Sequence, residues 1–118
     1  MGVTRHETPI PAVLGRNDLD YQSTKPRLLL VGGLDGSATS VDATLAFLRW
    51  FYHDPSADEL RSRFTLSAVP IANPDGWAAG SGVKNQSGGN PTMGYPPEGD
   101  AYLSPTDPEA AYLWRWVG

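Results

Sequence analysis

The sequence predicts a small α/β domain in which helices flank a short, mainly parallel sheet, and three observations support this fold class. Residues 27–32 (RLLLVG) form a continuous apolar run, which is typical of a central strand covered on both faces. Residues 39–52 follow with the apolar spacing of a helix, and residues 65–72 (TLSAVPIA) form a second strand-like run. A strand–helix–strand order favours parallel pairing through a right-handed crossover, and 118 residues suit one such domain.

The first strand is expected to end at Gly32 and Gly33, where the chain turns into the first helix. In that helix, apolar side chains recur at intervals of four, three and four residues and predict one buried stripe, made of Val41, Leu45, Leu48 and Tyr52. Thr39 and Asp42 resemble a capping box at its start, with Asp in place of Glu or Gln. Residues 53–55 (HDP) end the helix, because a proline disfavours helical geometry at the residue before it.

The crossover is expected to continue through a second, shorter helix. Residues 56–64 (SADELRSRF) are mostly polar, and Ser56 is the residue type that caps a helix start. The second strand at residues 65–72 then runs into a turn at residues 73–76 (NPDG), where proline fixes the backbone and glycine tolerates a positive φ.

The C-terminal segment, residues 107–118 (DPEAAYLWRWVG), predicts a third helix. Asp107 stands at the cap position and Pro108 at the first helical position, which together are a strong start signal. Its apolar side is expected to be formed by Ala111, Leu113, Trp114 and Val117. Trp114 and Trp116 lie about 200° apart around a helix, so one of them is expected at a sheet edge or an interface.

Two stretches have no clear periodicity: an irregular lead-in at residues 1–25 and a long loop at residues 77–106. The chain contains 13 glycines and 11 prolines, and these gather in the second half. A sheet of two or three strands leaves edges unprotected, which favours pairing with another chain. We therefore expect self-association through the sheet edge or the C-terminal helix.

Composition excludes several classes of protein. The net charge is -4, from 9 basic and 13 acidic side chains with no run of like charge, which argues against nucleic-acid binding and against a basic membrane-surface helix. No apolar run approaches the ~20 residues that span a bilayer. The absence of cysteine excludes disulfides and thiolate zinc sites, and it suits a reducing compartment such as the cytoplasm.

The loop at residues 32–40 (GGLDGSATS) follows the first strand, at the end of the sheet where α/β proteins bind ligands. Glycine amides and a helix start suit an anion, although the loop has no lysine and Asp35 opposes negative charge. A nucleophile at Ser37 or Ser40 needs a base, and no local pattern ties either histidine of the chain to this loop. The third reading is a metal site, to which Asp35 supplies one carboxylate.

Three segments resemble the zinc carboxypeptidase family, which includes succinylglutamate desuccinylase-like members. Residues 31–48 (VGGLDGSATSVDATLAFL) are similar to its first metal-binding segment, a strand followed by Gly-Gly-x-His-Gly-x-Glu and a helix. Residues 69–77 (VPIANPDGW) are similar to a strand ending in Pro-x-x-Asn-Pro-Asp-Gly, and residues 107–117 to a helix that opens with Pro-Glu. The matched structural positions are Gly32, Gly33, Gly36, Asn73, Pro74, Asp75 and Gly76. This order implies that residues 1–118 form a single domain resembling the N-terminal half of the family's fold.

The resemblance also implies a zinc site, from which this sequence departs. Asp35 stands where the family has its first ligand histidine, and Ala38 stands where it has its ligand glutamate. The family's third ligand histidine and general-base glutamate come after the last matched helix, beyond Gly118. A catalytic zinc takes three protein ligands and keeps one position open for water. We therefore expect a domain truncated relative to the family, with no cofactor and with zinc as the alternative.

The substrate-binding positions of the family fall on other residue types here. Its Asn-Arg pair falls on Asn90 and a proline, and Lys84 or Asn85 falls near its other arginine. The expected function is a catalytically silent carboxypeptidase-like domain that acts as a binding or structural module. One alternative is an active zinc carboxypeptidase or amide hydrolase that acts on a peptide or small amide through Asp35, a histidine such as His6 and a second chain. The other is a small anion-binding module at residues 32–37.

Overall fold

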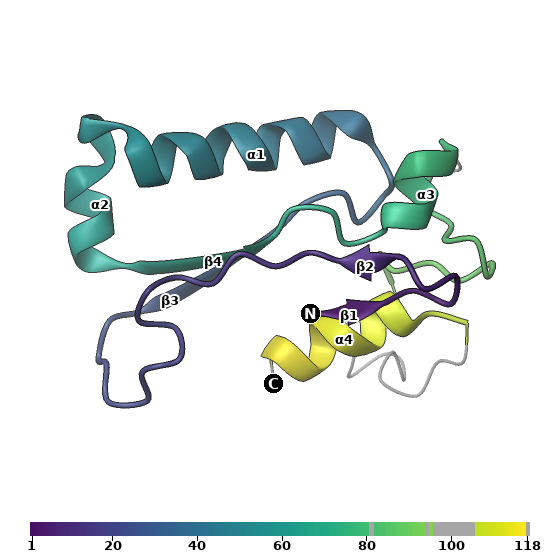
Figure 1. Cartoon of the computed structure of the whole chain (residues 1–118), viewed down its shortest axis with the longest axis horizontal. Helices are drawn as coiled ribbons and strands as arrows, with labels where there is room; N and C mark the ends of the chain where they lie inside the picture. The colour runs from purple at the N-terminus through teal and green to yellow at the C-terminus, as the bar shows by residue number, and fades with distance from the viewer. Residues whose placement is uncertain (81, 94, 96–105, 118) are drawn as a thin grey trace.

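Figure 1 shows the computed structural model of the chain, which describes all residues except 81, 94, 96–105 and 118. Part of the predicted loop at residues 77–106 therefore lies outside the described residues. Within the part that is described, no helix is long and apolar enough to cross a membrane.

Two parallel strands form the centre of the fold where the apolar runs predicted strands, but the first of them lies at an edge of the sheet and is not covered on both faces as expected. They are β3 (Arg27–Val31) and β4 (Thr65–Val69), paired in register from Arg27↔Thr65 to Val31↔Val69. All five residues of β4 are buried, whereas β3 is exposed at its start and half-buried at its end. The second strand ends earlier than residues 65–72 suggested.

The crossover between the two strands consists of α1 (Ala38–His53), a 3₁₀ turn η1 (Pro55–Ala57) and α2 (Asp58–Arg63). Ser56 does not cap a helix, which corrects the prediction for residues 56–64. Asp54 caps η1 by accepting a hydrogen bond from the Ser56 N–H at 2.8 Å, and the Ser56 hydroxyl accepts one from the Trp50 indole. The proline at position 55 favours this tight turn, so α2 starts two residues later.

The lead-in is more ordered than an irregular segment. It forms a two-stranded antiparallel pair, β1 (Gly2–Val3) and β2 (Pro9–Ile10), and then runs along the outer edge of β4. There the Val13 N–H donates to Ala68 O and the Ala68 N–H donates to Val13 O, both at 2.8 Å. One edge of β4 is thus paired with β3 and the other with the lead-in.

Figure 1 shows α1 along one face of the β3–β4 pair and α4 (Pro108–Val117) on the opposite side. The core is divided accordingly. On the α1 side the buried cluster consists of Leu48, Phe51, Leu66 and Ala68. On the α4 side it consists of Ile10, Val69, Ala72 and Leu113. The α/β class with a parallel sheet and flanking helices is confirmed.

The buried stripe of α1 differs from the predicted one. Its buried residues are Val41, Thr44, Leu48 and Phe51, and Leu45 is 46% exposed. Thr44 is buried because it lies against Gly32. A Cβ added at Gly32 would come within 2.1 Å of the Thr44 hydroxyl oxygen. The hydroxyl donates to Ser40 O at 2.9 Å, so a threonine is tolerated at this buried position.

The buried face of α4 is also shifted from its predicted position. Glu109, Ala110 and Leu113 are buried, whereas Val117 is 65% exposed. Asp107 caps the helix as predicted, with its carboxylate accepting from the Ala110 N–H at 3.3 Å.

Candidate functional site at the carboxyl end of the sheet

The loops that follow β3 and β4 are hydrogen-bonded to each other. The Ala72 N–H donates to Gly32 O at 2.9 Å, and the Asn73 N–H donates to Gly33 O at 3.1 Å. Gly36 has a φ of +68°, and a Cβ at this position would lie 2.4 Å from the backbone oxygen of Gly82. The loop after β3 therefore packs closely against the segment after β4.

Asp35 lies half-buried in this loop, and its side chain completes the turn into α1. Its Oδ1 accepts a hydrogen bond from the Ser37 N–H at 3.0 Å. Ser37 in turn caps α1, because its hydroxyl accepts from the Ser40 N–H at 3.1 Å. The cap is thus Ser37 rather than Thr39, and the predicted capping box is wrong by two residues. Ala38 is the first residue of the helix and is exposed.

Four of the backbone amides that could hold an anion in this loop are already engaged. The Gly32 N–H donates to Val69 O, the Gly36 N–H to Gly33 O, and the Gly33 N–H to the Ser40 hydroxyl at 3.0 Å. With the Ser37 N–H bonded to Asp35, three of these four donors are used within residues 33–40 and the fourth is used by β4. These four amides are therefore not available for the anion-binding alternative at residues 32–37, which stays a prediction.

Residues 73–76 begin a helix instead of forming a free turn, which corrects the prediction for NPDG. The helix is α3 (Pro74–Ala79), with Pro74 in its first turn. Asn73 caps it: its Oδ1 accepts from the Gly76 N–H at 2.9 Å, while its Nδ2, fully buried, has no hydrogen-bond partner among the described residues. Helix α3 also occupies the first residues of the predicted loop at 77–106.

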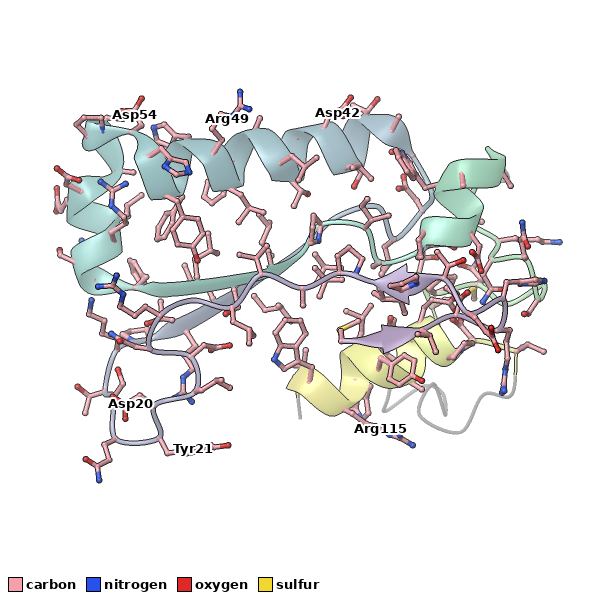
Figure 2. The ribbon with its side chains drawn as sticks, viewed as in Figure 1. Asp20, Tyr21, Asp42, Arg49, Asp54 and Arg115 are labelled. Atoms are coloured by element: carbon pink, nitrogen blue, oxygen red, sulfur yellow. The ribbon has the colours of Figure 1, made fainter. Side chains whose placement is uncertain are left out.

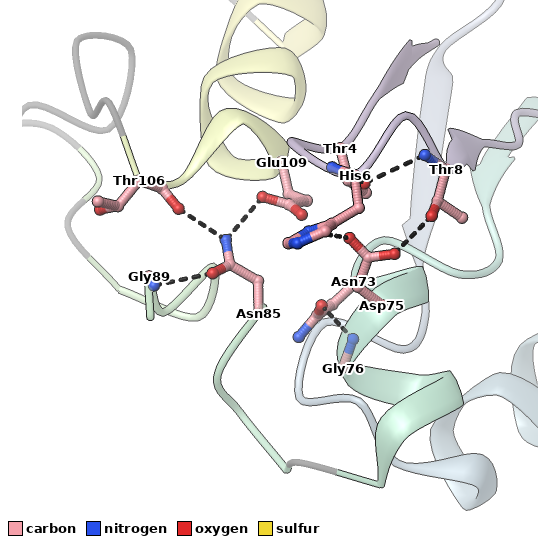
Figure 3. A network of polar contacts seen from close by, with 10 residues as sticks. All are labelled: Thr4, His6, Thr8, Asn73, Asp75, Gly76, Asn85, Gly89, Thr106 and Glu109. Atoms are coloured by element: carbon pink, nitrogen blue, oxygen red, sulfur yellow. Dashed lines mark hydrogen bonds and ion pairs between the residues drawn. The ribbon is translucent and has the colours of Figure 1, made fainter. Parts of the chain in front are cut away.

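The side chain of Asp75 is buried and binds the lead-in rather than the loop after β3. Its Oδ1 accepts from the Thr8 hydroxyl at 2.6 Å, and its Oδ2 lies 3.7 Å from His6 Nδ1 (Figure 3). The Thr4 hydroxyl holds the backbone of this hairpin by accepting from the His6 and Thr8 N–H groups. Sequence reasoning named both His6 and Asp75 but gave no sign that they meet, since 69 positions separate them without a local pattern.

A second polar group, also drawn in Figure 3, joins the loop after α3 to the start of α4. Asn85 is 4% exposed, and its Nδ2 donates to Thr106 O at 2.9 Å and to Glu109 Oε2 at 2.8 Å. Its Oδ1 accepts from the Gly89 N–H at 2.8 Å. Burial raises the pKa of Glu109, which is 1% exposed, and burial likewise raises the pKa of Asp107.

The other two predicted substrate contacts lie nearer the surface. Asn90 is half-buried, and its Oδ1 accepts from the Thr92 N–H at 3.1 Å and from the Thr92 hydroxyl at 2.6 Å. Lys84 is exposed. A substrate role for Lys84, Asn85 and Asn90 stays a prediction, but both polar atoms of the Asn85 side chain already serve the loop.

The donor set at the implied zinc position does not fit a catalytic zinc. Asp35 offers one carboxylate, of which one oxygen is engaged by a backbone amide, and Ala38 offers no ligand atom. Among the described residues there is no group of three or more His, Asp or Glu side chains able to hold a metal ion. These residues do not provide the three protein ligands that a hydrolytic zinc requires.

Among solved structures, the chain is similar to one described as a metallo-carboxypeptidase from Burkholderia cenocepacia. The TM-score is 0.74 at 22% sequence identity, and the match covers 98% of this chain and 31% of that chain. This likeness shows a carboxypeptidase-like fold. The chain spans less than a third of the length of that neighbour. No protein-family model and no curated protein matches the sequence.

Proposed function

We propose that this chain is a carboxypeptidase-like domain without a zinc hydrolase centre, and that it acts as a binding module by pairing with a second copy of itself. The lack of a fitting donor set around Asp35 supports the first part. The free edge of β3, beside an apolar groove on α4, carries the second part.

Strand β3 pairs with β4 along one edge, and no described strand pairs with its other edge. The Thr65 N–H donates to Pro26 O and the Gly32 N–H donates to Val69 O, so the even-numbered positions of β3 face β4. In a parallel ladder the intervening residues, Leu29 and Val31, then direct their backbone groups outward. Soluble proteins usually protect such an edge with a charge, a proline or a bulge, and residues 28–31 are all Leu or Val.

The free edge of β3 lies next to an apolar groove of ≈ 240 Å³. The groove is lined by Val31, Leu34, Tyr95, Leu113, Trp114 and Val117. Trp114 is half-buried there, and Trp116 lies half-buried against the α4-side core, so the two indoles take different sides of the helix as their spacing predicted. An apolar groove beside an unpaired strand edge suits a partner that supplies both a strand and apolar side chains.

A second copy satisfies both requirements without placing like charges together. When two β3 strands pair antiparallel about Leu29, Leu28 faces Leu30 of the partner subunit and Arg27 faces Val31 of the partner subunit. Arg27 itself is held by Asp18, with Nε 3.7 Å from the carboxylate, and by the carbonyl of Asp20. The strand therefore contributes no repulsive pair to this arrangement.

Sedimentation equilibrium of the whole chain, from micromolar to millimolar concentration, tests this association. We expect a monomer–dimer equilibrium that Val117→Asp shifts to the monomer, because a carboxylate in the groove must lose its hydration. Val83→Asp makes the same change at an exposed apolar residue outside the groove (42% exposed) and is expected to leave the equilibrium unchanged. A monomer at every concentration, or equal effects of the two variants, would contradict the proposal.

Metal analysis tests the absence of a hydrolytic centre. After incubation with zinc and dialysis, we expect far less than one zinc per chain and no chelator-sensitive cleavage of peptides with a free carboxyl end. Stoichiometric zinc that Asp35→Ala releases, together with such cleavage, would establish the active alternative instead. This measurement is independent of the association experiment, so either part of the proposal can fail alone.

A further inference from the structure

A cavity of ≈ 340 Å³ opens at the end of the molecule opposite the loops described above. It lies between the lead-in, the end of α1, α2 and the start of β4. Its polar lining includes Arg16, Asn17, Lys25 and Arg61, and its apolar wall includes Phe51 and Phe64. This volume is in the range of small-molecule sites, which span about 300–1,000 Å³.

The charge of this cavity is opposite to that of the chain. The chain has a net charge of -4, yet three of its nine basic side chains line this one cavity and no carboxylate does so among the described residues. Arg61 is neutralised by an ion pair with Asp58. Arg16 and Lys25 have no carboxylate within ion-pair distance in the described part of the chain, which leaves two uncompensated cations.

The acids nearest in sequence are bound elsewhere. The Asp18 carboxylate accepts from the Ser67 hydroxyl at 2.8 Å and pairs with Arg27. Asp20 Oδ1 accepts from the Gln22 N–H at 3.0 Å. Lys25 is half-buried, and its Nζ makes one hydrogen bond, to the carbonyl of Arg61 at 3.2 Å. An ammonium has three donors, so Lys25 retains hydrogen-bonding capacity for a ligand.

Three carbonyl groups at the end of α1 and the start of β4, which would oppose an anion, are occupied. The guanidinium of Arg61 donates to the carbonyls of Phe51 and Asp54. The Tyr52 hydroxyl donates to Leu66 O at 2.5 Å, and burial and the negative charge of Asp18 raise the pKa of Tyr52, so it stays a neutral donor. The negative end of the helix is thereby partly compensated, and Arg16 and Lys25 remain as the cations of the cavity lining that no carboxylate pairs among the described residues.

From this geometry we infer that the cavity binds a small oxyanion, a carboxylate or a phosphate, carried on an apolar or aromatic body. Lys25 and Arg16 bind the oxyanion, Asn17 adds an amide donor, and Phe51 and Phe64 contact the body. Carboxylate and phosphate both offer oxygen acceptors that these donors recognise. The titration described next distinguishes the two head groups.

Calorimetric titration of the whole chain at low ionic strength tests the inference, with benzoate, phenyl phosphate and inorganic phosphate as probes. We expect benzoate or phenyl phosphate to bind more tightly than inorganic phosphate, and the stronger of the two identifies the head group. Lys25→Met is expected to weaken binding about tenfold or more, because it removes a charge-assisted hydrogen bond. Arg16→Gln is expected to weaken it less, since Arg16 is exposed.

The matched control is Arg49→Gln, which removes one exposed positive charge from the outer side of α1 (Figure 2). It leaves the cavity intact and is expected to leave the affinity unchanged. Arg16→Gln also guards against misfolding, because an exposed side chain in a loop contributes little to stability. No binding of any probe, or an equal loss in the Arg49 and Lys25 variants, would overturn the inference.

Discussion

Asn85 is expected to hold the loop after α3 against α4, and Asn85→Ala measures that role. Its side chain makes three hydrogen bonds, to Thr106 O, Glu109 Oε2 and the Gly89 N–H, at 2.8–2.9 Å. A net contribution of about 1 kcal/mol for each backbone bond and about 1.5–3 kcal/mol for the carboxylate bond gives an upper sum of about 5 kcal/mol. Water reaches the exposed Thr106, which reduces the loss, so we expect about 3 kcal/mol of destabilisation.

Urea unfolding followed by tryptophan fluorescence and linear extrapolation provides the measurement. Asn90→Ala is the matched control, because the same substitution in the same loop removes a half-buried side chain that bonds chiefly to its neighbour Thr92. We expect that control to cost less than about 1 kcal/mol, as is usual away from buried networks. The reasoning is refuted if Asn85→Ala unfolds at the urea concentration of the wild type or of Asn90→Ala.

Three further predictions concern the loops and the buried acid. Gly36→Ala is expected to destabilise the fold by more than about 2 kcal/mol, because a positive φ costs about 1–2 kcal/mol and the added Cβ meets a backbone oxygen at 2.4 Å. Gly80→Ala has a similar φ of +62° but open space around the Cβ, so it should show the conformational cost alone in the same unfolding assay. Ser37→Ala is expected to cost about 1 kcal/mol as the loss of the α1 cap, and Thr39→Ala close to nothing; the reverse order would restore the capping box. Burial raises the pKa of Glu109 above its ordinary value of 4.5, so between that value and the raised one the folded state keeps a proton that the unfolded state has lost. Stability should therefore fall as pH rises through this window, and Glu109→Gln should flatten that fall; parallel curves for the two proteins would count against it.

The fold followed from local patterns, and the errors arose where two patterns overlap. The apolar runs located both strands, although only β4 is buried along its whole length and β3 is exposed at its start. On α1, the spacings of Leu45 and Thr44 from Val41 are both helical, and the choice between them depends on Gly32, which comes close to Thr44 in the folded chain. Residues 73–76 fit a turn and a helix start equally well, because Asn followed by Pro suits both.

The candidate site could be predicted only in part. The carboxyl end of the sheet was located from the glycine-rich loop, and the missing ligand at Ala38 is visible in the sequence itself. The contact of His6 with Asp75 could not be derived, since it depends on a lead-in hairpin whose strands are two residues long. Asn85 matched a substrate position by its place in the chain, whereas its burial depends on where α4 packs.

The lead-in pairs with the outer edge of β4 at one bridge, between Val13 and Ala68, and covers that side of the sheet there. A sheet with two open sides can add subunits without end and grow into a filament, whereas a sheet with one open side cannot. In the dimer proposed above, each copy covers the open β3 edge of the other, so assembly would stop at a closed pair. If that dimer forms, loss of the lead-in would expose the outer edge of β4 as well, and the chain could then associate through both edges into a filament.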